Sequence, residues 1–291
     1  MRPLLPALLP VVAAPAARAQ TEPVRTSAGE ITISTYPWWG HDDINPSFRR
    51  TSAPMYAPAT TTYPYPTQDT LSRTKVDHTY QTMVLENEYL KVTVIPELSG
   101  HVHQVLDKVI KPSLIGLRGA WSSGGIEFNT GPQDHTVTCL SPVEAEFIDF
   151  GDGSKAIAIG NVEQVYHTQW VAIVRLRPGC AALEERIRIC NPTGDRHICY
   201  FWNCVAVPNS PASQLIYPMT LGTDHAGTKF TPWPIYEGRD ISWLKSYDEP
   251  TSIFSYRCDQ DFYGWYDHAA DRGVLAHANH LELCGKKSVS V

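Results

Sequence analysis

The sequence has few charged residues, and several repetitive patterns are missing from it. Charged side chains make up 19% of the 291 residues, whereas apolar residues make up 43% and aromatic residues 10%. A disordered chain would be richer in charge and poorer in aromatics. Neither Gly-X-Y triplets nor heptads occur, which excludes collagen and coiled coils. The length suits one large domain or two small ones with a substantial core.

The chain also has no excess of basic residues and little cysteine. The 24 Lys and Arg residues against 30 Asp and Glu give a net charge of −6, so a nucleic-acid partner is not expected. Seven cysteines are a low density for a disulfide scaffold, and an odd number leaves at least one without a partner in the chain. Cys190 and Cys199 flank a turn-rich segment, and they face each other if it is a hairpin; otherwise both are ordinary buried thiols.

The first nineteen residues resemble a secretory signal. Arg2 supplies a positive start, Leu4 to Val12 are mostly apolar, and Ala17-Arg18-Ala19 fits a cleavage site. Four prolines interrupt this segment, and the alternative is a disordered Ala/Pro leader. No later apolar run approaches the roughly 20 residues of a membrane span. The sequence therefore predicts a secreted protein with no membrane partner.

Residues 20–80 differ in composition from the rest of the chain. They are rich in Pro, Thr, Ser and Tyr, and Tyr63-Pro64-Tyr65-Pro66 is incompatible with a helix or a central strand. The aromatic side chains of this region would be poorly placed in water. We therefore expect an extended arm packed on a domain formed by residues 81–291.

Strand-like patterns begin near Met83. Leu90, Val92 and Val94 alternate with polar residues. Further strands are expected at 162–176, 183–189 and 198–207, and the short turns between them predict an antiparallel meander. Fifteen residues of clean helical periodicity occur nowhere. The expected class is all-β, a large antiparallel two-sheet sandwich.

The densest cluster of candidate site residues surrounds Gly124-Gly125-Ile126-Glu127-Phe128-Asn129. Adjacent glycines permit a positive φ or a close approach to a ligand. Glu127 and Asn129 are two apart and share a strand face. An arginine, an aromatic ring and a histidine flank them: Arg118, Trp121 and His135. This composition is typical of a sugar site. The alternative is a structural β-bulge with Glu127 paired to Arg118.

A second cluster lies in a proline-rich region, where sites on β-sandwiches often gather. It contains Asp224, His225, Trp233 and Asp240. One of its carboxylates and Glu127 form a possible acid/base or acid/nucleophile pair for glycoside cleavage. The alternative is that these are solvated loop charges.

Histidine spacing does not define a metal site. His101 and His103 are two apart, and His277 and His280 are three apart. A metal site needs three or four convergent ligands, and no third ligand is fixed by spacing. G-x-S-x-G, P-loop, Rossmann and H-E-x-x-H motifs are absent from the sequence. We therefore expect no metal and no organic cofactor.

Several segments resemble known proteins. Residues 84–97 resemble the opening strands of a galactose-mutarotase-like domain. Five others resemble an uncharacterised conserved domain often fused to tetratricopeptide repeats: 109–112, 115–121, 123–129, 200–203 and 216–219. The resemblance covers about residues 36–287. It implies a β-supersandwich that binds carbohydrate in a cleft on one sheet, with Glu127 as an acid/base or nucleophile, and its matching segments include Asn203.

Three departures from this family stand out. His101 occupies a position where a basic residue of the arginine type is expected. About a dozen residues are missing between Lys108 and Val109. The family continues with another strand beyond the point where this chain stops, and a missing strand would expose a sheet edge. We therefore expect a C-terminally truncated domain.

The leading hypothesis is a secreted carbohydrate-active enzyme. As a glycoside hydrolase it would use Glu127 with Asp240 or Asp224, while Trp121, Trp233 and His225 position the sugar. As an epimerase it would use Glu127 to take the anomeric proton and His135 or His225 to protonate the ring oxygen. The expected partner is an oligosaccharide or polysaccharide. The alternatives are a non-catalytic carbohydrate-binding module and an inactive truncated fragment.

Overall fold

The computed structural model describes residues 21–37, 72–110, 113–116, 125–130, 142–197 and 201–290. These residues form antiparallel sheets, and their helical turns are the short 3-10 segments η1 (Pro96–Leu98) and η2 (Leu244–Ser246). The expected all-β sandwich class is therefore confirmed. None of the helices in the described residues has the length and apolar character needed to cross a membrane.

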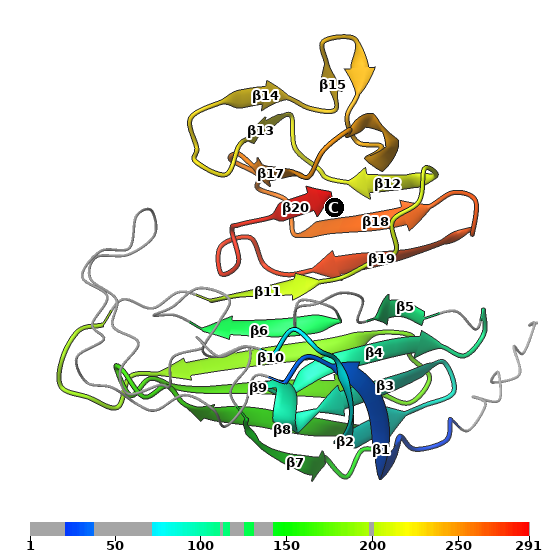
Figure 1. Ribbon diagram of the computed structural model, residues 1–291, viewed down its shortest axis with the longest axis vertical. Coiled ribbons are helices and arrows are strands. Elements are labelled where there is room, and N and C mark those ends of the chain that lie inside the picture. Colours follow the sequence, from blue (N-terminus) through cyan, green and yellow to red (C-terminus); the bar gives the residue numbers. More distant parts are fainter. Residues whose placement is uncertain are drawn as a thin grey trace, which may run out of the picture.

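A seven-stranded sheet and a four-stranded sheet form the main sandwich (Figure 1). The larger sheet has the order β1-β2-β3-β4-β6-β11, with β5 paired to β4, and the smaller has the order β10-β9-β8-β7. The strands of the larger sheet are β1 (Arg25–Thr35), β2 (Val76–Glu86), β3 (Leu90–Ile95), β4 (His101–Asp107), β5 (Ser113–Gly116), β6 (Ile126–Thr130) and β11 (Phe201–Val205). Those of the smaller sheet are β7 (Glu144–Asp149), β8 (Lys155–Val162), β9 (Gln169–Leu176) and β10 (Leu183–Cys190).

The core of this sandwich follows from strand alternation. Leu90, Val92 and Val94 of β3 point inward, as the sequence pattern predicts. Ile157 and Trp170 meet them from the smaller sheet. Each such buried aliphatic side chain stabilises the fold by about 1.5–3 kcal/mol.

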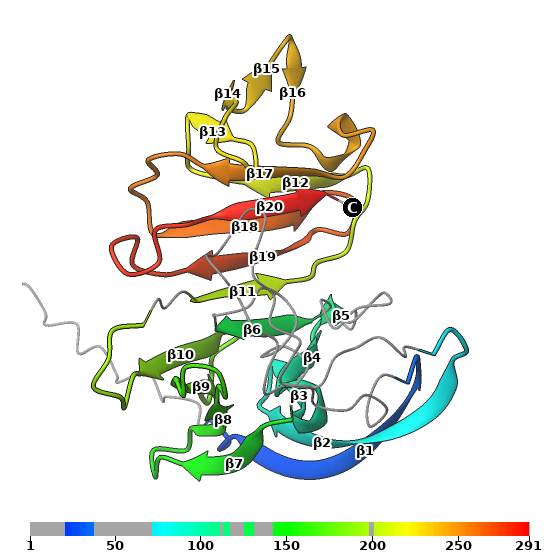
Figure 2. The same ribbon diagram turned by 60° about the vertical axis from the view of Figure 1, so that its left-hand side comes forward.

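A second group of sheets lies at the other end of the long axis (Figures 1 and 2). One sheet has the order β12-β18-β19, another β14-β13-β17-β20, and β15 pairs with β16. The strands are β12 (Ser213–Ile216), β13 (Leu221–Thr223), β14 (Phe230–Pro232), β15 (Ile235–Tyr236), β16 (Arg239–Asp240), β17 (Thr251–Ser255), β18 (Phe262–Asp267), β19 (Arg272–His277) and β20 (Lys287–Ser290). Their own core consists of Tyr217, Met219, Trp233, Ile241 and Ile253.

One predicted strand and one predicted strand arrangement differ from the structure. The single strand expected at 162–176 is wrong, because the chain turns between β8 and β9. The Glu163 carboxylate accepts the backbone N–H groups of Val165 and Tyr166 and so closes this turn. The predicted three-strand meander is also wrong, since β11 leaves β9 and β10 and pairs with β6 in the larger sheet.

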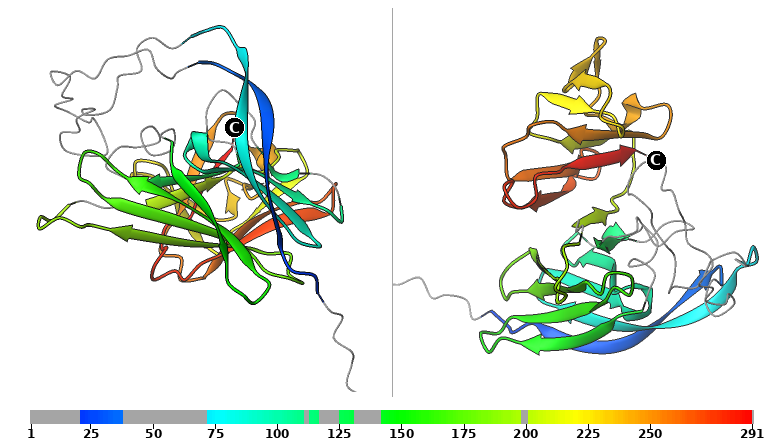
Figure 3. Two further views of the ribbon diagram at one scale, coloured as in Figure 1. Left: turned by 90° about the horizontal axis from the view of Figure 1, so that it is seen from below. Right: turned by 90° about the vertical axis from the view of Figure 1, so that its left-hand side faces the viewer.

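The N-terminal region contributes a long edge strand. β1 pairs with β2 along its whole length, from Arg25 opposite Glu86 to Thr35 opposite Val76, and Figure 3 shows the two strands side by side. The remainder of the expected arm, residues 38–71, and the expected signal segment lie outside the described residues. The strands on either side of residues 191–200, β10 and β11, belong to different sheets, so the alternative in which this segment is a hairpin is wrong. Cys190 has a free thiol, and Cys199 lies outside the described residues.

Candidate functional site

The face of the larger sheet turned away from the sandwich core carries a row of polar side chains. Ile126 and Phe128 of β6 belong to the core, so Glu127 and Asn129 point to the opposite face. Trp202 and Cys204 of β11 are their cross-strand partners and share that face. We call this surface the Glu127 face.

His101 extends the Glu127 face onto β4. Val102 pairs with Ile126 and lies in the core, so the side chain of His101 points the other way, beside Glu127. His101 and Glu127 are each 1% exposed and Asn129 is fully buried. A buried carboxylate, amide and imidazole therefore converge on adjacent strands.

Hydrogen bonds fix the carboxylate. Asn129 Nδ2 donates to Glu127 Oε1 at 3.0 Å. The Cys204 thiol also bonds to Glu127, and burial together with the Glu127 charge raises the pKa of that thiol to about 12. Cys204 thus acts as a neutral donor rather than a nucleophile. Asn129 Oδ1 is buried and accepts no hydrogen bond from the described residues.

The structure shows why position 125 is occupied by glycine. Its φ is +67°, and a Cβ there would lie 2.0 Å from the carbonyl oxygen of Val102. The close approach that the sequence predicts is therefore made to the backbone of β4 and not to a ligand. This contact sets β6 against β4 and so positions Glu127 next to His101. Gly124 lies outside the described residues.

Asn203 does not belong to the Glu127 face. It pairs with Phe128 and points into the sandwich, where its Nδ2 donates to Oε2 of Glu185 at 2.7 Å. Burial raises the pKa of Glu185 from 4.5 to about 7, although the bond from Asn203 opposes this shift. Sequence reasoning missed Glu185. The sequence pattern that could have identified it is the alternation in β10, where Glu185 falls on the same inward-facing side as Leu183 and Ile187.

Two carboxylates of the second cluster hold turns. Asp224 Oδ1 accepts the backbone N–H groups of Thr228 and Lys229 at 2.7 and 3.0 Å, and these bonds lower its pKa. Asp240 Oδ1 accepts the backbone N–H of Ser242 at 3.0 Å and its hydroxyl at 2.7 Å. Both carboxylates therefore have local hydrogen-bond partners.

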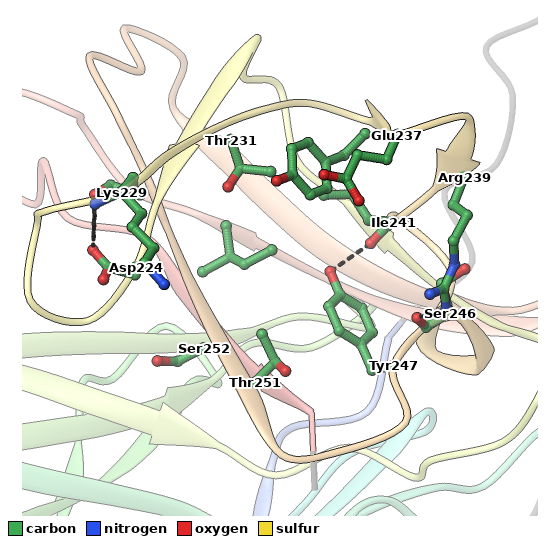
Figure 4. A pocket seen from close by; sticks show the side chains of 13 residues that line it. Asp224, Lys229, Thr231, Glu237, Arg239, Ile241, Ser246, Tyr247, Thr251 and Ser252 are labelled. Atoms are coloured by element: carbon green, nitrogen blue, oxygen red, sulfur yellow. Dashed lines mark hydrogen bonds between the residues drawn. The ribbon is translucent and has the colours of Figure 1, made fainter.

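Asp224 also lines a cavity of about 270 Å³ (Figure 4). Tyr236 and Tyr247 supply rings to this cavity, and Lys229 and Arg239 supply positive charge. Glu127 is not among the lining residues, so the cavity is separate from the Glu127 face. Trp233 is buried in the core beside Tyr217, with ring centroids 5.7 Å apart.

His225 lies next to Phe254 of β17. Its ring packs edge-on against Phe254 at 5.5 Å. The ammonium of Lys287 lies 5.2 Å from the centroid of the same Phe254 ring and is close enough to Cys204 to act on its thiol pKa. His225 and Lys287 thus share one aromatic neighbour, and the charge of Lys287 acts on the thiol that bonds to Glu127.

Three predicted site residues, Arg118, Trp121 and His135, lie outside the described residues. Among the described residues, no group of three or more His, Cys, Asp or Glu side chains gathers in a way that could hold a metal ion. His280, one of the histidines considered for metal binding, pairs with Asp261 at 2.8 Å instead.

The chain is similar to a solved structure with tetratricopeptide repeats. This is a TPR-domain containing protein from Parabacteroides distasonis, with a TM-score of 0.74 and 23% sequence identity. The match covers 94% of this chain and 47% of that one, so the chain spans about half the length of its structural neighbour. Residues 58–290 match a family model described as a domain of unknown function, DUF5107. The resemblance to an uncharacterised domain is therefore confirmed, and the chain belongs to the DUF5107 family.

Proposed function

We propose that this chain is a secreted carbohydrate-binding protein of galactose-mutarotase-like fold, and that it exchanges protons at an anomeric centre on the Glu127 face. The observation that carries the proposal is the buried row of Glu127, Asn129 and His101 on one sheet face. A cluster of buried ionisable and amide groups on one face is a candidate for a functional site.

The chemistry requires a base and an acid on opposite sides of the sugar ring oxygen. Glu127 takes the proton of the anomeric hydroxyl while a histidine protonates the ring oxygen, and the bond from the anomeric carbon to the ring oxygen breaks. Rotation of the resulting aldehyde and the reverse transfers close the ring with the other configuration. Among the described histidines, His101 lies opposite Glu127 in the strand register, and His225 is the second candidate.

Hydrolysis has less support than epimerisation. A glycosidase needs two carboxyl groups about 5–10 Å apart across the substrate. Asp224 and Asp240 have turn-closing hydrogen bonds, and Glu185 faces the interior of the sandwich. None of these three described carboxyl groups is shown on the Glu127 face, where a hydrolase would need its second carboxyl group.

The test is anomer exchange measured by NMR on a panel of free aldoses, together with a glycan array. The parent protein is compared with Glu127→Gln and with a control, Glu163→Gln. Glu163 is also fully buried, but its carboxylate caps a turn in the smaller sheet. We expect exchange in the parent and the control and its loss in Glu127→Gln.

Other outcomes separate the alternatives. Sugar binding without exchange by the parent would leave a non-catalytic binding module. Release of a shorter oligosaccharide would favour the hydrolase. If the folded protein neither binds a sugar nor exchanges its anomers, the carbohydrate proposal is contradicted.

A further inference from the structure

A lysine is buried in the sheet formed by β14, β13, β17 and β20. Lys286, which immediately precedes β20, is 4% exposed. Its Nζ is buried and makes no hydrogen bond within the described part of the chain. Buried ammonium groups are normally paired, because an unpaired one loses its hydration without compensation.

Ser255 lies directly beside this lysine. The register of β17 with β20 runs from Thr251 opposite Ser290 to Phe254 opposite Lys287. The backbone N–H of Ser255 continues it by donating to the carbonyl of Lys286 at 2.9 Å. Opposed residues on antiparallel strands share a face. Ser255 Oγ is also buried and has no hydrogen-bond partner among the residues described.

Further hydroxyl groups lie on the same face. Ser288 is two residues along β20 from Lys286 and lies near the hydroxyl of Tyr217, which is buried and makes no hydrogen bond within the described residues. Burial raises the pKa of Tyr217, so its hydroxyl stays protonated at working pH. Ile253, opposite Ser288, belongs to the core of this end of the molecule. The polar groups thus lie at the margin of an apolar core.

The missing partner of Lys286 must be an acceptor. Ammonium groups only donate, and a hydroxyl donates one hydrogen bond as well. The ion pairs of the described residues do not include Lys286, so its positive charge lacks a carboxylate there. An oxygen-bearing anion satisfies both the charge of Lys286 and the hydroxyl of Ser255.

We propose that Lys286 and Ser255 form an enclosed binding site for a small oxyanion, a phosphate or a carboxylate. This site is independent of the Glu127 face. The next residue, Lys287, points to the other side of the sheet, where it lies over Phe254. Two consecutive lysines therefore serve opposite faces, and Lys287 provides a matched control.

The test is thermal unfolding in inorganic phosphate, in acetate and in chloride at equal ionic strength. The proteins are the parent, Lys286→Met and Lys287→Met, each equilibrated for hours because the site is enclosed. A tenfold excess of anion over its Kd raises the Tm by about 3 °C. We expect this rise over chloride in the parent and in Lys287→Met, and its absence in Lys286→Met.

The comparison of the three anions identifies the ligand, and the comparison of the variants can contradict the proposed site. A rise in phosphate alone identifies a phosphate site, and a rise in acetate alone identifies a carboxylate site. An equal rise in Lys286→Met would show a general salt effect and overturn the proposal, as would no rise in the parent. If Lys286→Met does not fold, calorimetric titration of Ser255→Ala decides: we expect a Kd about tenfold weaker, from one lost hydrogen bond to a charged group. An unchanged Kd would overturn the site.

Discussion

Asn203 on the edge strand of the larger sheet donates a 2.7 Å hydrogen bond to Glu185 on the edge strand of the smaller sheet. The two sheets of the main sandwich are thereby joined at one edge by a polar contact beside the apolar core. This relationship makes the stability of the sandwich sensitive to pH.

Glu185 should make the protein less stable as the pH rises. Its pKa is raised from 4.5 to about 7 on folding, so the folded state binds the proton more tightly than the unfolded state. The resulting stability is fully present below pH 4.5 and is lost as the pH approaches 7. The loss amounts to as much as about 3 kcal/mol. Urea unfolding between pH 5 and pH 8 measures it.

Glu185→Gln provides the control for this pH dependence. Glutamine keeps an oxygen that accepts from Asn203 and removes the ionisation. We expect the variant to be more stable than the parent above pH 7 and to have a flatter profile between pH 5 and 7. An unchanged slope would assign the pH dependence to other groups.

Gly125→Ala should disrupt the junction of β4 and β6. The new Cβ meets the Val102 carbonyl oxygen at 2.0 Å, and the φ of +67° adds backbone strain. We expect a loss of about 3 kcal/mol or more in chemical denaturation. Gly194→Ala is the control, since a Cβ at Gly194 has nothing within 4 Å. Equal stability of the two variants would contradict the close contact.

Cys204 should resist alkylation. With a pKa of about 12 against an ordinary 9.0, its thiolate fraction at mildly alkaline pH is reduced by about three orders of magnitude. Iodoacetamide labelling followed by peptide mass spectrometry should modify the exposed Cys284 first. Labelling of Cys204 at the rate of Cys284 would show that the thiol does not donate to Glu127.

Asp224→Ala should affect its loop more than any activity. The carboxylate holds the backbone of Thr228 and Lys229, so its removal should expose residues 225–229 to limited proteolysis. The rate of anomer exchange by the same variant should stay within a factor of about two of the parent rate. Lost exchange with an unchanged proteolysis pattern would instead place Asp224 in the reaction.

The sequence predicts the class of fold because alternation is a local property. The alternation of Leu90, Val92 and Val94 with polar residues predicts both the strand and its buried face. The pairing of β11 with β6 is non-local, because it joins residues more than seventy positions apart, and no turn signal encodes it. For the same reason the sequence groups Asn203 with Asn129, whereas the strand register places them on opposite faces.

The candidate site was predictable in part. The two-residue spacing of Glu127 and Asn129 correctly predicts a shared face, and the structure adds a hydrogen bond between the two side chains. The role of Asp224 in closing a turn depends on where the chain folds back five residues later, which spacing alone does not reveal. The sequence does not single out Glu185, because its raised pKa results from burial in the folded sandwich.

β11 brings the two polar clusters of the main sandwich within one residue of each other. Asn203 faces Glu185 on one side of this five-residue strand, and Cys204 faces Glu127 on the other. A slip of one residue that brings the Cys204 thiol to Glu185 would bring Val205, and not the amide, to Glu127, so both hydrogen bonds would be broken together. The register of β11 is thus specified twice, so variation in the length of the preceding connection, residues 191–200, is tolerated only where it leaves that register unchanged.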